Sequence, residues 1–297
     1  MADRGISTSL GPFAEMSKPG RVHSSRRTRA SASLKVGSGF GYQAAARGCM
    51  LEVPMLEVRG LSIRFGGLQA VRDVSFVAEA GAITALLGPN GAGKTTIFAL
   101  LAGFLRPGAG RVSFDGVDIA GWAPERIARA GMVRTFQVTQ PFAGLSVAHN
   151  IRVGAFLRHR RVADAEAWAR EVGTRLGLGA MLDRAASSLT VAGRKRLEVA
   201  RALATGPRLL LLDEVIAGLN PSEIDEIVAL IRGVRDGGVT VVLIEHVMRA
   251  VAALADRAHV LAQGALIASG RVAEIAGDPA VIEAYLGHGA AARMAHG

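Results

Sequence analysis

The 297-residue sequence has little cysteine, few aromatic residues and no long apolar run. Cys49 is the only cysteine, which excludes an internal disulfide or a zinc site built on several cysteines and fits a reducing compartment. The longest uncharged apolar run, residues 95–105, is roughly half the ~20 residues needed to span a bilayer. The seven histidines do not cluster at metal-ligand spacing. We therefore expect a soluble protein, or one that a partner holds at a membrane, with a core mainly of Ala, Val, Leu and Ile.

Positive charge is concentrated near the N-terminus. Residues 1–50 contain eight Lys or Arg and two acidic residues, a surplus of +6 within the net charge of +10. Such a segment could bind nucleic acid or acidic lipid, remain a disordered extension, or act as an Arg- and Ser-rich targeting peptide, although no apolar h-region is evident. Ordered-looking sequence begins near Met50 and Met55, so either could be the true start. We treat residues 1–54 as a basic, disordered extension or a mis-assigned start, without a function.

Residues 55–286 predict one α/β domain. Alternating apolar and polar residues over 55–65, followed by a Gly-Gly pair, indicate a strand and a turn. Further along, a strand at 208–213, a helix at 222–235 and a strand at 239–244 form a βαβ unit. Such a unit predicts a parallel sheet that is buried on both faces.

Two other stretches complete this outline. Residues 110–120 resemble a hairpin in which Asp115 and Gly116 form the turn. Helical spacing dominates residues 144–186, which predicts a helical subdomain over about 144–200, inserted within the α/β domain. Residues 287–297 follow as a C-terminal tail.

The motif "GPNGAGKT", Gly88 to Thr95, fits the phosphate-loop pattern G-x-x-x-x-G-K-[ST]. It follows an apolar strand predicted at 83–87 and opens a helix predicted at 94–105. Glycine lets the backbone wrap an anion closely, so that successive N–H groups and the helix N-terminus face it. Lys94 would reach the β- and γ-phosphates, and the Thr95 hydroxyl would bind magnesium. A glycine-rich turn without a ligand is the plainer alternative.

The segment "RLLLLDE" at 208–214 places two carboxylates at the end of a strand. Four consecutive leucines indicate a strand buried on both faces, and Asp213 and Glu214 follow at its carboxyl end, beside the phosphate loop. Asp213 would hold magnesium through water, and Glu214 would lie where water attacks the γ-phosphate. Buried strands often end in acidic residues, so this segment indicates chemistry only together with the phosphate loop.

The order of these motifs resembles the ATP-binding subunit of ABC transporters over about residues 55–286. The motifs are "GPNGAGKTT", "RTFQ" at 134–137, a small-residue loop before a helix, "LLLLDE", "AGLNP" and "IEH". Two further stretches, "FGGLQAV" at 65–71 and "DPAVIEAYLG" at 278–287, are similar to the ATPase subunits of branched-chain amino acid importers. The resemblance implies an α/β fold, the P-loop NTPase fold of an ABC-type nucleotide-binding domain, with an antiparallel β subdomain and a helical subdomain.

The same resemblance implies roles for single residues. Phe65 would stack on the adenine, with Val71 flanking the base. Gln137 would reach the magnesium ion and the attacking water, and His246 would contact the γ-phosphate. The plainer alternatives are a strand aromatic for Phe65, a surface amide for Gln137 and a core residue for His246. The family resemblance and the order of the motifs disfavour the alternatives for Gln137 and His246.

Together these roles define an expected site with ATP and Mg²⁺ as its cofactors. The catalytic residues are Glu214, His246 and Gln137. The nucleotide-binding residues are Phe65, Val71, Gly88, Pro89, Asn90, Gly91, Ala92, Gly93, Lys94, Thr95 and Thr96. The magnesium ligands are Thr95, Gln137 and Asp213.

The loop at 189–193 departs from the usual family signature, L-S-G-G-Q. This chain has Leu189, Thr190, Val191, Ala192 and Gly193 in its place. Thr190 keeps a hydroxyl that can bind a γ-phosphate, and the rest of the binding would depend on backbone N–H groups at a helix N-terminus. A positive φ at Ala192 would cost on the order of 1–2 kcal/mol. We expect an altered but working clamp on the ATP of a second subunit; the alternative is a weakened site that needs its membrane partners.

The resemblance implies an ATPase subunit that powers solute import, with branched-chain or other hydrophobic amino acids as the expected cargo and amides or urea as alternatives. It would act at the cytoplasmic face of the bacterial inner membrane, as a homo- or heterodimer of ABC ATPases with two membrane permease subunits and, indirectly, a periplasmic binding protein. Two other classes stay open, a soluble ABC ATPase acting on nucleic acid or ribosomes and a non-catalytic regulator. No nucleic acid is expected, because the sequence shows neither a second cassette nor a long coiled-coil insertion.

Overall fold

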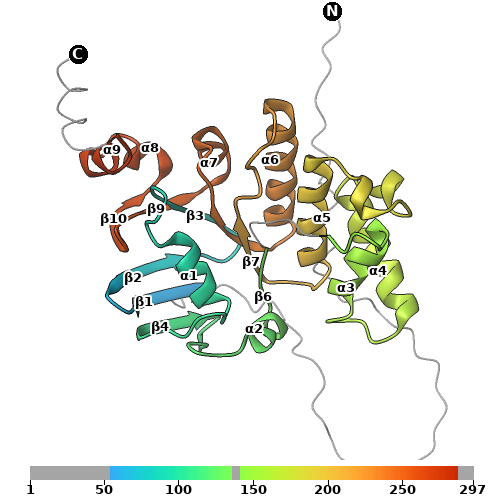
Figure 1. The fold of residues 1–297 in the computed structure, drawn as a ribbon, viewed down its shortest axis with the longest axis horizontal. Helices are drawn as coiled ribbons and strands as arrows, with labels where there is room; N and C mark the ends of the chain where they lie inside the picture. The colour runs from blue at the N-terminus through green and yellow to red at the C-terminus, as the bar shows by residue number, and fades with distance from the viewer. Residues whose placement is uncertain (1–53, 136–140, 287–297) are drawn as a thin grey trace, which may run out of the picture.

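A computed structural model describes residues 54–135 and 141–286, which form two sheets and a set of helices (Figure 1). The antiparallel sheet lies at the lower left of Figure 1, the mainly parallel sheet crosses the centre, and a group of helices lies at the right. Most of the N-terminal extension, the C-terminal tail and Gln137 fall outside the described residues.

The first sheet is antiparallel, with the strand order β2-β1-β4-β5. Its strands are β1 (Leu56–Phe65), β2 (Leu68–Ala78), β4 (Ala109–Phe114) and β5 (Val117–Asp118). Buried and more exposed residues alternate along much of β1, as in a sheet with one face on a core. Asp115 and Gly116 join β4 to β5 with φ angles of 50° and 77°, which confirms the predicted hairpin.

The second sheet has the strand order β10-β9-β3-β8-β7-β6, parallel throughout except for β10. Its strands are β3 (Ile83–Leu87), β6 (Met132–Arg134), β7 (Leu209–Asp213), β8 (Thr240–Ile244), β9 (Arg257–Ala262) and β10 (Ala265–Gly270). Every residue of β3, β7 and β8 is buried, as their apolar runs predict. Side chains on the two faces of β3 enter two different apolar clusters, Leu87 in one and Leu86 in the other. The residues that follow β3, β7 and β8 meet at one edge, because carboxyl ends of parallel strands share an edge.

Three helices form the group at the right of Figure 1, namely α3 (Val147–Ala155), α4 (Val162–Arg175) and α5 (Val191–Leu203). Two short 3-10 turns, Gly179–Met181 and Ala186–Ser188, lie between α4 and α5. Gly154 lets α3 approach α5 closely, since a Cβ there would lie 2.1 Å from the carbonyl oxygen of Arg201. Ser146 and Thr190 cap α3 and α5 by accepting backbone N–H groups, which fixes where each helix begins.

The other helices are α1 (Lys94–Leu101), α2 (Pro124–Ala130), α6 (Pro221–Asp236), α7 (Met248–Leu254), α8 (Val272–Ile275) and α9 (Pro279–Leu286). Residues of α6 and α7 belong to the apolar cluster on one face of the second sheet, and those of α1 to the cluster on the other. The helix predicted over 94–105 ends at Leu101. Gly103 adopts a φ of +77°, and a Cβ there would lie 2.4 Å from the Trp122 carbonyl oxygen.

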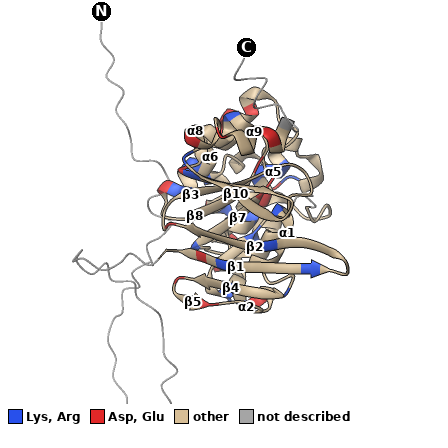
Figure 2. Ribbon diagram, turned by 90° about the vertical axis from the view of Figure 1, so that its left-hand side faces the viewer, with Lys and Arg blue, Asp and Glu red and all other residues tan. Residues whose placement is uncertain are grey.

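Charged residues are spread over the strands and helices rather than gathered on one element (Figure 2). Within residues 54–135 and 141–286, no helix is long and apolar enough to cross a membrane.

Candidate active site

The phosphate loop joins β3 to α1 through a backbone conformation that requires glycine. Gly91 and Gly93 have φ angles of 80° and 100°, in a region that other residues rarely adopt. A Cβ on Gly93 would also lie 2.6 Å from the carbonyl oxygen of Ala70 on β2. Helix α1 begins at Lys94 without a side-chain cap. Its first backbone N–H groups are therefore suited to an anionic partner.

Lys94 is held against the loop to which it belongs. Its Nζ donates hydrogen bonds to the carbonyl oxygens of Gly88 at 2.7 Å and Pro89 at 2.9 Å, and the residue is 6% exposed. Burial lowers the pKa of the Lys94 ammonium, while the charges of Glu214 and Asp213 oppose that shift. The loop thus fixes a positive charge beside the helix N-terminus, where phosphates would bind.

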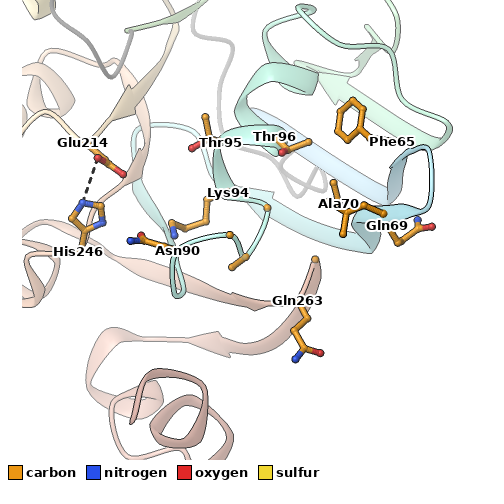
Figure 3. A pocket seen from close by; sticks show the side chains of 15 residues that line it. Phe65, Gln69, Ala70, Asn90, Lys94, Thr95, Thr96, Glu214, His246 and Gln263 are labelled. Carbon is orange, nitrogen blue, oxygen red and sulfur yellow. Dashed lines mark ion pairs between the residues drawn. The ribbon is translucent and has the colours of Figure 1, made fainter. Parts of the chain in front are cut away.

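A cleft of about 920 Å³ lies over the phosphate loop (Figure 3). Phe65, Gln69 and Ala70 lie at one end of the cleft, Glu214 and His246 lie at the other, and the loop lies between them. This volume is typical of small-molecule sites. Phe65 is 46% exposed, so its ring is accessible to a flat base.

Most of the predicted loop residues line this cleft, and three predicted nucleotide contacts do not. The loop residues that line it are Asn90, Gly91, Ala92, Gly93, Lys94, Thr95 and Thr96. Val71 is fully buried in the apolar cluster beneath the loop, because the β1–β2 register shifts between Val74 and Val71, where Asp73 has a φ of 49°, and this turns Val71 toward the core. Ala70 and Gln69, which were not predicted, line the cleft from that strand. Gly88 and Pro89 also lie outside the lining; they accept the Lys94 hydrogen bonds instead.

Asp213 ends β7 in a fully buried position. Its Oδ2 accepts a hydrogen bond from Arg134 Nη2 at 2.7 Å, and its backbone N–H donates to the Thr135 hydroxyl at 3.1 Å. Burial raises the pKa of the Asp213 carboxyl, and the hydrogen bond and charge of Arg134 oppose that shift. The motif "RTFQ" points to Gln137 by resemblance, whereas Arg134, which opens the same motif, was not predicted.

The groups around Asp213 fit a magnesium ion. Its second carboxylate oxygen, Oδ1, is buried and has no hydrogen-bond partner among the described residues. Thr95 is exposed and lines the cleft, whereas the fully buried Asp213 is not among the residues that line it. In the described part of the chain, no three His, Cys, Asp or Glu residues are grouped as a metal site. This set still suits magnesium, which often uses one or two carboxylates together with substrate phosphates and water. Gln137, the third predicted ligand, lies outside the described residues.

Glu214 has an uncommon backbone conformation at the end of the cleft. Its φ of 52° is left-handed, which costs a non-glycine residue on the order of 1–2 kcal/mol. Its N–H donates to the Ile244 carbonyl oxygen at 3.0 Å, and its own carbonyl oxygen accepts from Lys195 Nζ at 2.9 Å. Its Oε2 lies 3.4 Å from Nε2 of His246 (Figure 3). Strain of this kind is found at functional sites, and here it accompanies a carboxylate–imidazole pair that faces the cleft.

A further carboxylate, Glu245, was not predicted although it lies within "IEH". It is 1% exposed and accepts the Ile216 N–H at 2.9 Å, which joins the segment after Glu214 to the end of β8. Burial raises the pKa of Glu245 from 4.5 to about 7, and its hydrogen bonds with backbone N–H groups oppose the shift. One feature of the sequence could have indicated Glu245: it is a charged residue directly after an apolar strand and beside a predicted catalytic histidine.

The loop at 189–193 forms the start of α5 without left-handed residues. Thr190 has a φ of −60°, and its hydroxyl oxygen accepts the Gly193 N–H at 3.1 Å. Helix α5 begins at Val191, so Ala192 lies in the first helical turn and has no positive φ. Backbone geometry here therefore does not require the two glycines of the usual signature. All five residues are described, and none of them lines the cleft of their own chain.

The fold and the phosphate loop define a P-loop nucleotide-binding protein. The sequence matches the family described as ABC transporter over residues 71–217, and the family described as branched-chain amino acid ATP-binding cassette transporter over residues 265–291. In solved structures, the ADP conformation of MJ1267, an ATP-binding cassette of an ABC transporter, has a TM-score of 0.73 at 30% identity. That match covers 80% of this chain and 100% of the other.

Two curated relatives define the branch. The chain is 42% identical over 254 residues to BraF of Pseudomonas aeruginosa, a high-affinity branched-chain amino acid transport ATP-binding protein, with coverage of 79% of this chain and 98% of BraF. It is 40% identical over 250 residues to LivG of Escherichia coli, which has the same description, with coverage of 79% and 98%. The chain belongs to the ABC transporter family, as an ATP-binding cassette that hydrolyses ATP. The predicted fold class and enzyme class are thereby confirmed.

Proposed function

We propose that this chain is the ATPase subunit of a branched-chain amino acid importer and acts at the cytoplasmic face of the inner membrane. The observation that carries the proposal is the order of groups along one cleft. Phe65 lies at one end, Lys94 lies in the middle, and Glu214 with His246 lies at the other. The match of residues 265–291 to a branched-chain amino acid cassette family, and the descriptions of BraF and LivG, support the cargo.

In this proposal each group acts on one part of the nucleotide. Phe65 stacks on the base, and Lys94 with the N–H groups of α1 binds the β- and γ-phosphates. Magnesium bound at Asp213 Oδ1 and Thr95 would neutralise charge on those phosphates. The Glu214 carboxylate accepts the proton of the attacking water, and His246, 3.4 Å from it, donates a hydrogen bond to the γ-phosphate.

The signature loop serves a second subunit in this proposal. Thr190 and the N–H groups at the start of α5 bind the γ-phosphate of the ATP in a partner cassette, arranged head to tail as a homo- or heterodimer. An exposed Thr190 at a helix N-terminus, outside the cleft of its own chain, supports this arrangement. Two membrane permease subunits and, through them, a periplasmic binding protein complete the assembly.

A hollow beside the active site offers a contact surface for a permease subunit. It has a volume of about 340 Å³ and lies between the end of β6 and the helices α3 and α5. Phe142 and Val153 line it, and each is nearly half exposed. Arg134, which pairs with Asp213, lines the same hollow. A permease segment bound there would contact the residue that holds the magnesium carboxylate.

The dimer is tested with the purified Glu214→Gln variant, which should retain ATP without hydrolysing it. Light scattering with ATP and magnesium should show a dimer, and the added change Thr190→Ala should weaken it because both a phosphate contact and the cap of α5 are lost. Thr190→Ser in the same background keeps both the helix cap and the hydroxyl, so it should dimerise normally. A monomer that binds ATP in all three variants contradicts a homodimer, and addition of a second cassette then tests the heterodimer.

The cargo is tested in vesicles that contain the complete importer. ATP hydrolysis should rise when the periplasmic binding protein is loaded with leucine, isoleucine or valine, and radiolabelled leucine should accumulate inside. Stimulation by an amide or urea alone would contradict the proposed cargo while leaving the ATPase assignment intact.

A further inference from the structure

Tyr285, on the last described helix, contacts the first glycine of the phosphate loop. The backbone N–H of Gly88 donates a hydrogen bond to the Tyr285 hydroxyl oxygen at 2.7 Å, across 197 positions of sequence. The ordinary pKa of a phenol is about 10, and partial burial raises that of Tyr285 further, so the hydroxyl is neutral near pH 7 and accepts this N–H through a lone pair. No role for Tyr285 is predicted from the sequence beyond its place in the branch-specific stretch at 278–287.

Gly88 is constrained on three sides. Tyr285 binds its N–H, and Lys94 Nζ binds its carbonyl oxygen at 2.7 Å. Its φ is +138°, and a Cβ there would lie only 2.1 Å from the carbonyl oxygen of Leu261 at the end of β9. One residue therefore connects the Tyr285 hydroxyl to the Lys94 ammonium through two hydrogen bonds.

The outer side of the phosphate loop is otherwise open toward α9. A cavity of about 390 Å³ separates the two and is lined by Pro89 and Gly91 from the loop and by Ala280 and Glu283 from the helix. Because this space is not filled by side chains, packing does not fix the loop on that side. On that side, the position of the loop therefore depends mainly on the hydrogen bond from the Gly88 N–H to Tyr285.

Helix α9 is held in place by apolar packing that does not involve Tyr285. Val281 is 9% exposed and belongs to the main apolar cluster, and α9 packs against β10. The helix is therefore held by the core, and Tyr285 projects from it to the loop.

We propose that Tyr285 is a positioning residue for the phosphate loop. Its hydroxyl sets the orientation of the Gly88 peptide and, through the Gly88 carbonyl oxygen, the place of the Lys94 ammonium that binds the phosphates of ATP. The proposal rests on nucleotide binding in the cleft over this loop. It assigns to the C-terminal helix a role in phosphate binding that is distinct from its packing.

The test compares Tyr285→Phe, which removes only the hydroxyl, with Val281→Ala, which loosens the packing of α9 and keeps the hydroxyl. Displacement of a fluorescent ATP analogue from the full-length protein gives the affinity for ATP and, separately, for adenosine. One lost hydrogen bond predicts that Tyr285→Phe binds ATP about 2- to 10-fold more weakly. Adenosine affinity should not change, because adenosine has no phosphate for Lys94 to bind.

Two further measurements separate positioning from packing. In steady-state kinetics, Tyr285→Phe should raise the KM for ATP by the same factor and leave kcat within about 2-fold of wild type. Amide hydrogen exchange of the nucleotide-free protein should be faster in the peptide that contains Gly88. Val281→Ala should lower Tm without a selective loss of ATP affinity.

Two outcomes would overturn the proposal. The first is a Tyr285→Phe variant that binds ATP as tightly as wild type, with unchanged amide exchange at Gly88. The second is a variant that loses ATP and adenosine affinity equally, as Val281→Ala would if packing alone mattered. A wild-type protein that binds no ATP would instead contradict nucleotide binding in the cleft.

Discussion

The proposed function assigns phosphate binding to two half-sites of this chain, and these differ in backbone geometry. The first half-site is the phosphate loop with Asp213, Glu214 and His246, and the second is the loop at 189–193. The first keeps its glycines because Gly91 and Gly93 have positive φ angles. The second has lost two signature glycines, and Ala192 lies there in an ordinary helical turn. Glycine is required where φ is positive or another backbone lies close, and a helix N-terminus requires neither.

The largest expected effect concerns the buried charge of the first half-site. Arg134→Leu would leave the fully buried Asp213 carboxylate without its ion-pair partner, which costs on the order of 3–5 kcal/mol of unfolding free energy. Urea denaturation of the nucleotide-free protein measures this loss. Arg134→Lys, which keeps the positive charge, should lose much less unfolding free energy than Arg134→Leu. Equal stability of Arg134→Leu and wild type would show that the first half-site does not depend on this pair.

A second prediction concerns the pH dependence of stability. The pKa of Glu245 is raised from 4.5 to about 7, so between these values the folded protein binds more protons than the unfolded chain. Stability conferred by the protonated carboxyl is present below pH 4.5 and is lost as pH rises toward 7, by roughly 3 kcal/mol at most. Glu245→Gln, which stays neutral, should flatten the curve of unfolding free energy against pH over that interval. An unchanged slope would contradict the raised pKa.

A third prediction tests the glycine argument directly. In Gly93→Ala the added methyl group would meet the Ala70 carbonyl oxygen at 2.6 Å, at a φ of +100°. ATP affinity measured by calorimetry should fall on the order of 10- to 100-fold. Gly91→Ala is the matched control, because its φ is also positive but no atom lies within 4 Å of the added Cβ. If both variants lose the same affinity for ATP, the close approach to the Ala70 carbonyl oxygen does not contribute. The positive φ alone then explains why glycine is required at these positions.

The smallest effect is expected in the second half-site. Ala192→Gly partly restores the usual signature, but it should cost about 0.5–1 kcal/mol of stability because glycine disfavours a helical turn. ATP-dependent dimerisation and hydrolysis should stay within about 2-fold of wild type. A large gain in dimer affinity would mean that the signature glycines contribute something that the helix N-terminus does not.

The sequence predicts elements and motifs better than the contacts between them. The strand at 83–87 is predicted correctly because an apolar run lies between turn residues, so its pattern is local. The ion pair between Arg134 and Asp213 depends on the register in which β6 pairs with β7. The two residues are 79 positions apart, so no local sequence pattern predicts their contact. The resemblance places Val71 beside the base, whereas a register shift in β2 turns it into the core, and no local pattern predicts such a shift. The sequence leaves open whether the φ of Ala192 is positive or negative. The Thr190 cap starts α5 at Val191, so Ala192 lies in a helical turn with a negative φ.

The hydrogen bond from Lys195 to the carbonyl oxygen of Glu214 crosses the boundary between the two half-sites. Lys195 belongs to the second turn of α5, and Glu214 belongs to the turn after β7. In the proposed dimer, the free energies of occupying the two half-sites would not be independent, because a shift of α5 would move the backbone that positions Glu214. By thermodynamic linkage that influence would be reciprocal, so a nucleotide in this chain's own cleft would change the affinity of α5 for the nucleotide of a partner by the same free energy.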